Sequence, residues 1–577
     1  MNAITTSELD ALATAVSGPE MMRHMQEFAR WTKHAGTPEE LESLRYVQSA
    51  MDGYGYRTEI ILHDAFISLP GKARVTALGR EMRCITHAFS RPSAPGGLTG
   101  ALVAVGAGGE SDFEAADVRG RIVLVDGIAS PAVSLRASEA GAIGQLHVSP
   151  HEHCHEMCIS PVWGSPTDEQ LSRLPKTVVV TVAAAAGAAL HGALKDGPVT
   201  VTLHAEVDTG WRKTPILVTD MDGPAGGGDE PYVLYSGHHD TWYYGVMDNG
   251  GANATMMEVA RLCATRRDHW RRGLRVAFWS GHSQGRYSGS TWYADQNWEE
   301  IERRCVAHVN VDSTGGMGNT VVADTGTASE LAALAREAVR VQAGQALSGR
   351  RMSRAGDESF WGIGVPAMFG NMGEQPASGA ANASAAVFGG GARLGHGTGW
   401  WWHTPDDLLD KIDESVLIRD TRIYLHAVWR LLADDVLPID WEEHANYLLA
   451  ELTALGRGLD GRFDLSVLVA RAEALRDKAA RLKATRLDPA RINAALVAVS
   501  RALVPVDYST GDRFGQDPAL AQSAYPSLQP LRRLAALPPE SDAARFLTVR
   551  MMRARNRVCM ALAGANAALD AALAEAA

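Results

Sequence analysis

The sequence has few cysteines, no excess of positive charge and no long hydrophobic run. Its 577 residues include 6 scattered cysteines, without the dense spacing of a disulfide-stapled domain. The formal net charge of −12 argues against nucleic acid or an anionic membrane as a partner, since both require clustered lysine and arginine. No stretch reaches about 18 apolar residues, and the first residues do not resemble a signal peptide. We therefore expect a soluble, cytoplasmic protein whose partner is a small molecule or a short peptide.

Composition and periodicity divide the chain into four regions, which fits the two to four domains expected for this length. They are the first part of an α/β domain (1–65), a β-rich module (66–210), the main α/β domain (211–440) and a helical domain (441–577). The helical region carries an apolar helix face made of Leu468, Ala472, Leu475, Ala479 and Leu482. Its helices are expected to be interrupted by an ordered loop that begins at Val504.

The β-rich module contains the most informative of the short strands. A strand at 117–126, a helix from Ser134 and a second strand at 143–148 resemble a protease-associated domain, a module often inserted in exopeptidases. The segment His151–Cys158 follows and is dense in potential metal ligands. It is either a polar surface loop or a loop that leans over a catalytic cleft, where His153 and His155 would contact substrate or metal.

Polar side chains follow each short strand of the main α/β region. His238, Asp248 and Asp312 come at or just after predicted strands, and His403 lies in a later loop. Because parallel strands deliver their carboxyl ends to one sheet edge, these side chains are expected to meet there. Imidazole and carboxylate donors suit zinc and similar divalent ions. Each residue alone is more often structural, but four together predict a metal site.

Asp240 is a further candidate for the catalytic group. It lies two residues after His238, on the same face of the strand, and is expected to orient that imidazole. The intervening His239 should point away from the site.

These motifs are similar to those of the M28 metallopeptidases, in the branch that includes glutamate carboxypeptidase II and the transferrin receptor. The resemblance implies an α/β fold: a mixed sheet with helices on both faces, an inserted protease-associated domain and a C-terminal helical dimerisation domain, and hence a homodimer. It also implies that His238 and Asp312 bind one metal ion, that Asp248 bridges two ions, and that His403 binds the second.

One pair of residues departs from the family pattern. After the strand that ends at Trp279, family peptidases carry two glutamates, of which the first is the general base and the second a metal ligand. Here the pair is His282 and Ser283. A serine hydroxyl is a poor ligand for a divalent ion, so His282 is expected to act either as the base or as a metal ligand. Trp402 stands where this branch commonly has a tyrosine that stabilises the tetrahedral intermediate.

Five further residues are candidate substrate contacts. Arg286 and Tyr287 follow the altered pair, and an arginine fork can hold a carboxylate through two hydrogen bonds; packing at a helix start is the alternative. The resemblance places Arg354 and Asp357 beside the specificity pocket. His396 lies among glycines shortly before the predicted metal ligand and is either a substrate contact or a plain loop residue.

The motifs together predict a metal-dependent hydrolase of small peptide or amide substrates, similar to an aminopeptidase or carboxypeptidase. One or two divalent ions are expected, with zinc as the first expectation and iron or manganese as alternatives. Two other functions stay open. The same metal site would serve lyase or metal-redox chemistry on a small amino-acid-like substrate, or the chain would be a non-catalytic binding protein like the transferrin receptor.

Overall fold

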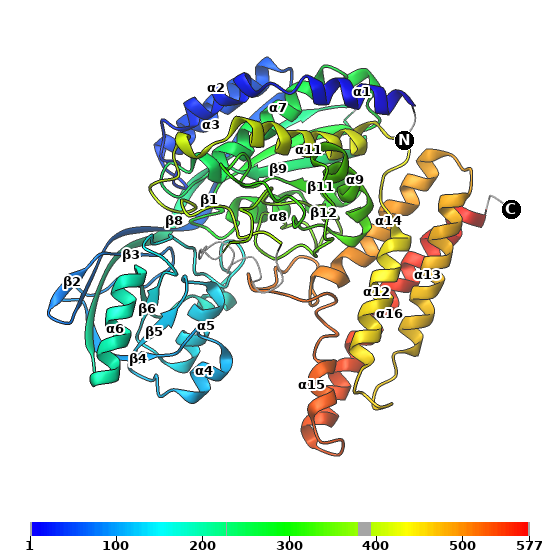
Figure 1. Ribbon diagram of the computed structural model, residues 1–577. Helices are drawn as coiled ribbons and strands as arrows, with labels where there is room; N and C mark the ends of the chain where they lie inside the picture. Colours follow the sequence, from blue (N-terminus) through cyan, green and yellow to red (C-terminus); the bar gives the residue numbers. More distant parts are fainter. Residues whose placement is uncertain (1–2, 227, 379–393, 575–577) are drawn as a thin grey trace.

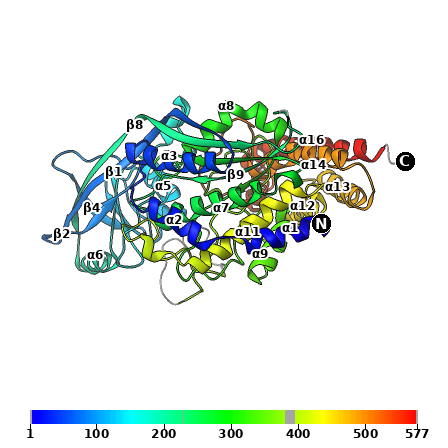
Figure 2. The same ribbon diagram turned by 90° about the horizontal axis from the view of Figure 1, so that it is seen from above.

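The computed structural model describes residues 3–226, 228–378 and 394–574. It consists of an α/β domain, a smaller domain on one side of it, and a bundle of long helices on the other (Figure 1). Figure 2 shows the same arrangement from above, with two long strands running from the α/β domain into the smaller domain.

The large sheet has its most buried strands at the centre of the α/β domain. In spatial order its strands in this domain are β12 (Ala367–Met368), β11 (Cys305–Asn310), β9 (Tyr232–His238), β10 (Gly273–Trp279) and β8 (Thr200–Met221), and beyond β8 the sheet continues into the smaller domain. The first four strands are parallel to one another, and β8 runs antiparallel to β10. Every residue of β9, β10 and β11 is buried, as expected for parallel strands covered on both faces.

Helices cover both faces of this sheet, which confirms the expected fold class. Alternate residues of β9 point to opposite sides: Val233 and Tyr235 join one core, and Tyr232 and Leu234 join another. The first core is closed by α1 (Ala3–Thr14), α2 (Gly18–Phe28), α3 (Pro38–Gly53), α7 (Ala252–Ala264), α9 (Ala332–Ala343) and α11 (Glu414–Ala433). The second core is closed by α8 (Ser288–Arg304).

The smaller domain is joined to the α/β domain by a two-stranded ribbon. The strand β1 (Arg57–Ala77) pairs antiparallel with β8 along almost its whole length. The predicted domain boundaries, at residues 66 and 210, therefore fall within these continuous strands. The rest of the domain contains β2 (Arg80–Met82), β3 (Cys84–Thr86), β4 (Leu98–Ala104), α4 (Glu110–Ala115), β5 (Ile122–Asp126), α5 (Pro131–Ala140), β6 (Gly144–Val148), β7 (Val178–Val182) and α6 (Ala184–Asp196).

The C-terminal helices pack against one another and against the α/β domain. They are α12 (Trp441–Gly456), α13 (Ser466–Ala484), α14 (Pro489–Tyr508), α15 (Leu531–Ala536) and α16 (Asp542–Ala574). The buried residues of α13 are the five predicted from the heptad-like spacing. The predicted loop at Val504 starts later than expected, because α14 continues through Pro505 to Tyr508.

The last helix, α16, is long and apolar enough by length and composition to cross a membrane, with a mean hydropathy of 1.2 over an 18-residue window. It packs along α13 and α14 (Figure 1), and 44% of that window is buried inside the molecule. A core helix of a helical bundle meets the same criteria, so this property is weak support for a membrane span.

Candidate metal centre

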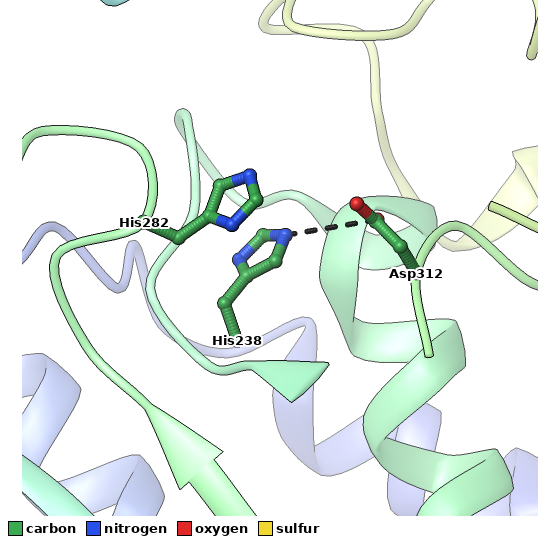
Figure 3. Close-up of side chains that lie close together, drawn as sticks. All are labelled: His238, His282 and Asp312. Carbon is green, nitrogen blue, oxygen red and sulfur yellow. Dashed lines mark ion pairs between the residues drawn. The ribbon is translucent and has the colours of Figure 1, made fainter. Parts of the chain in front are cut away.

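The candidate metal ligands meet at the carboxyl ends of the parallel strands. His238 is the last residue of β9, and His282 and Asp312 follow β10 and β11 (Figure 3). The Nε2 atom of His238 lies 3.3 Å from Asp248 Oδ1 and 3.6 Å from Asp312 Oδ1. His403 Nε2 lies 3.0 Å from the other oxygen of Asp248. Four residues spread over 166 positions of the chain thus surround one small space, as the sequence predicts.

Each of the three histidines has its second ring nitrogen tied to a fixed acceptor. His238 Nδ1 lies 2.7 Å from the backbone oxygen of Asp240, and His403 Nδ1 lies 2.7 Å from that of Glu156. His282 Nδ1 lies 2.7 Å from Asp357 Oδ2. A carbonyl oxygen only accepts, so the Nδ1 atoms of His238 and His403 donate. In the neutral ring the Nε2 lone pair then faces the site, which is the form that binds metals.

The electrostatics of the site favour a cation between the acids. Burial opposes a charge on His238, but the nearby carboxylates of Asp248 and Asp312 outweigh burial and raise the pKa of His238 well above its usual value. Burial also opposes the charge on Asp248, yet His238 and His403 hold the pKa of its carboxyl below the usual range. Among the described residues, neither His238 Nε2 nor Asp248 Oδ1 makes a hydrogen bond although both are buried. Buried nitrogen and oxygen atoms that lack a hydrogen-bond partner can instead serve as ligands of a divalent ion.

Asp240 lies behind His238, as predicted, and contacts it mainly through its backbone. Its backbone oxygen lies 2.7 Å from His238 Nδ1, and its carboxylate oxygen Oδ1 lies 3.9 Å from the same atom. The carboxylate is fully buried and accepts the backbone N–H groups of His282, at 3.1 Å, and Ser283, at 2.8 Å. It therefore fixes the loop that carries the altered pair. His239 points away from the site, as expected, and bonds with Asn253 and Ser43.

The His-rich segment of the smaller domain reaches the metal centre through its backbone. Glu156 donates its N–H to the carbonyl of His403 at 3.0 Å and accepts from His403 Nδ1. The buried His155 lies 2.5 Å from the Trp402 carbonyl through Nδ1 and 3.0 Å from His151 through Nε2. His153 is partly exposed beside the ring of Trp400, with the ring centroids 4.2 Å apart.

The indole of Trp402 lies against His403. The two ring centroids are 3.6 Å apart with their planes inclined by 20°, and only 3% of Trp402 is exposed. The stacked indole therefore restricts rotation of the His403 ring.

Arg354 and Asp357, two of the candidate substrate contacts, are occupied by protein partners. The buried guanidinium of Arg354 donates to the carbonyl groups of Tyr508, Asp517 and Pro518. Asp357 is 1% exposed and binds His282 and Ser290. These contacts indicate that Arg354 holds the segment from Tyr508 to Pro518 in place. Asp357 orients the ring of His282.

The remaining candidates are Arg286, Tyr287 and His396, and each contacts other parts of the protein. Arg286 Nη2 donates to the Ala519 carbonyl at 3.3 Å, and its buried Nε has no hydrogen-bond partner among the described residues. Tyr287 is buried with its ring edge-on to His282 at 4.8 Å. His396 donates its backbone N–H to Gln375; the Gly-rich stretch before it, up to residue 393, lies outside the described residues.

The backbone is strained around the centre. His403, Arg286, Tyr287 and Ser313 have positive φ angles of 59°, 50°, 70° and 46°. Residues other than glycine rarely adopt this left-handed conformation, and such residues concentrate at functional sites.

Several residues that hold the ligands in place were missed by the sequence analysis. Asp407 accepts the N–H groups of Met247, at 2.8 Å, and Asp248, at 3.1 Å, and so fixes the turn that presents the Asp248 carboxylate. Asn253 Nδ2 donates to the carbonyl of His238 at 2.7 Å. The only signal for Asp407 is its place in the motif His403-Thr-Pro-Asp-Asp.

The fold and this cluster together define an α/β domain with a candidate metal centre at the carboxyl edge of its parallel strands. Residues 217–428 match the model of peptidase family M28. The chain resembles the "Probable glutamate carboxypeptidase VP8" of Zea mays, at 25% identity over 347 residues, 48% of each chain. It is also 33% identical over 85 residues to "Aminopeptidase NAALADL1" of Mus musculus, 14% of this chain and 11% of that protein. The chain spans about half the length, or less, of these relatives.

Solved structures support the fold. A zinc aminopeptidase of Bacillus subtilis superposes with a TM-score of 0.55 at 19% identity, covering 73% of this chain and 96% of the other. A peptidase M28 precursor of Shewanella amazonensis gives a TM-score of 0.57 at 16% identity, covering 75% and 97%.

Asp407→Asn tests the role of the turn. Burial raises the pKa of Asp407 to about 7, although the N–H groups that it accepts favour its charged form. The amide keeps one acceptor oxygen and places an NH₂ group against a backbone N–H, so we expect zinc affinity to fall about 10- to 100-fold. Affinity is measured by competition with a chromophoric chelator. Asp406→Asn, at an adjacent exposed carboxylate, is the control and should bind zinc normally.

Proposed function

We propose that the chain is a metal-dependent hydrolase that cleaves short peptides or related amides as an exopeptidase. The observation that carries this proposal is the convergence of imidazole Nε2 atoms with the buried carboxylate of Asp248 and the partly buried carboxylate of Asp312 at the ends of β9, β10 and β11. A divalent ion held there would supply a water nucleophile at neutral pH and polarise the scissile carbonyl. The M28 match and the peptidase names of the relatives support peptide bonds over lyase or redox substrates.

We propose zinc as the ion. Neutral imidazole and carboxylate donors fit zinc, and the structural neighbours include zinc aminopeptidases. His238, Asp312, Asp248 and His403 would hold one or two ions. Iron or manganese would also accept this donor set, and metal analysis of the purified protein distinguishes them.

Metal removal tests the function. Dialysis against a chelator should abolish hydrolysis of a panel of dipeptides and aminoacyl amides, because both the nucleophile and the Lewis acid are lost. Zinc added back should restore the rate, whereas magnesium, which prefers oxygen ligands, should not. Hydrolysis that persists in protein shown to be metal-free would contradict the proposal, as would inactivity of the zinc-loaded protein on every substrate of the panel.

Arg286 supports a substrate that carries a carboxylate. Its guanidinium is partly buried and lies 4.9 Å from the ring centroid of Tyr287, and among the described residues no acidic side chain pairs with it. An unpaired, partly desolvated guanidinium is a strong binding site for a carboxylate.

Arg286→Leu should therefore raise KM for a peptide acid and leave kcat little changed. A hydrogen bond to a charged group is worth about 1.5–3 kcal/mol, so KM should rise about 10- to 100-fold. The matching peptide amide serves as the control substrate, and its KM should not change. An equal rise in KM for the acid and the amide would show that Arg286 acts through its packing against neighbouring residues and not by binding the carboxylate.

We also propose that the chain forms a homodimer through α16. Phe546 and Met560 are 76% and 73% exposed, and they lie with Val549 on the helix face opposite the buried one. Apolar side chains aligned on one exposed helix face favour a self-complementary contact with a second copy.

The double variant Phe546→Glu/Met560→Glu should convert the dimer to a monomer. Two carboxylates at the contact would have to be desolvated in the dimer. Size-exclusion chromatography with light scattering gives the mass, and Val341→Glu, at an exposed valine of α9, is the control. A wild-type protein that is monomeric at all concentrations tested would refute the proposal.

A further inference from the structure

His282 lies close enough to the metal site to be part of it. Its ring stacks on that of His238, with centroids 3.8 Å apart and planes inclined by only 13° (Figure 3). Among the described residues, His238, His282 and Asp312 form a group whose donor atoms all lie within 4.8 Å of one another. Two nearly parallel imidazoles thus face the same carboxylate.

Asp357 determines which nitrogen of His282 is free. One of its oxygens lies 2.7 Å from His282 Nδ1, and the other accepts the hydroxyl of Ser290 at 2.8 Å. The carboxylate is buried and fixed by both bonds, so it holds the ring orientation and leaves Nε2 as the lone-pair nitrogen. A carboxylate behind an imidazole is the usual arrangement for a histidine that binds a metal.

The number of ligands decides between the two roles open to His282. A histidine–aspartate pair also suits a general base, so the Asp357 contact alone does not discriminate. Catalytic zinc sites, however, use three protein ligands, typically of mixed imidazole and carboxylate type. His238 and Asp312 provide two, and Ser283 offers only a hydroxyl. Asp248 Oδ1 also faces His238 Nε2 at 3.3 Å, but the other oxygen of this carboxylate faces His403 Nε2 at 3.0 Å, so the charge of Asp248 is divided between the two histidines. His282 completes the set.

We propose that His282 is a ligand of the ion bound by His238 and Asp312, and that Asp357 is the residue that positions it. The inference rests on the proposed metal centre and specifies its ligands. It replaces the two-glutamate arrangement of the family with a site built on two histidines and Asp312, which Asp248 borders with one oxygen while its other oxygen faces His403.

The test measures metal binding directly. Zinc affinity is determined for the wild type, His282→Ala and Asp357→Asn, and X-ray absorption counts the imidazoles around zinc at one equivalent. We expect two imidazoles in the wild type and one in His282→Ala. Asp357→Asn should weaken binding about 10- to 100-fold, the range for a residue that only orients a ligand, and His282→Ala should weaken it more. His239→Gln, at a buried histidine that points away from the site, is the matched control and should bind zinc as the wild type does.

Two outcomes overturn the inference: His282→Ala that keeps wild-type affinity, or an unchanged imidazole count after the substitution. Circular dichroism establishes that each variant is folded. If His282→Ala does not fold, His282→Gln replaces it, and a wild-type count of one imidazole per zinc is decisive against the proposal. The hydrolase function is judged separately, because a zinc-loaded wild type that cleaves no peptide contradicts that function while leaving the ligand assignment intact.

Discussion

Buried acids need nearby positive charge, and this requirement governs the centre of the molecule. Asp248 and Asp312 lie where water is largely excluded, and an isolated carboxylate is costly there. Three imidazoles surround them, each with one nitrogen engaged by a backbone or carboxylate oxygen. The sheet brings these groups to one edge, and the turns and loops around it fix their directions. Imidazole nitrogens and carboxylate oxygens in this arrangement are suited to bind a divalent ion.

The positions of the metal donors could be predicted because they follow local patterns. Each lies at or just after a short apolar strand or within a compact motif, and parallel strands end at a common edge. His238, Asp248, Asp312 and His403 therefore meet as expected from the sequence. The five-residue apolar face of α13 was predictable for a similar reason, since helix periodicity depends only on neighbours along the chain.

The groups that orient the donors could not be predicted. Two of them are backbone oxygens, at Asp240 and Glu156, and a backbone oxygen leaves no trace in residue type. Asp357 is 75 positions from His282, and only the folded chain brings them together. The end of α14 was misplaced because proline usually stops a helix. Here the helix continues to Tyr508, and the carboxylate of Asp507 in its last turn binds Arg351 of the α/β domain at 2.8 Å and 2.9 Å.

The contact between Glu156 and His403 links the smaller domain to the chemistry of the larger one. The carbonyl that fixes the His403 ring belongs to a different structural unit, which is connected through the β1–β8 ribbon. Any molecule that draws the smaller domain outward must also free this imidazole to rotate. Thermodynamic reciprocity then requires that tighter ion binding hold the two units together. Ion binding by His403 and the contact between the two units would therefore strengthen each other.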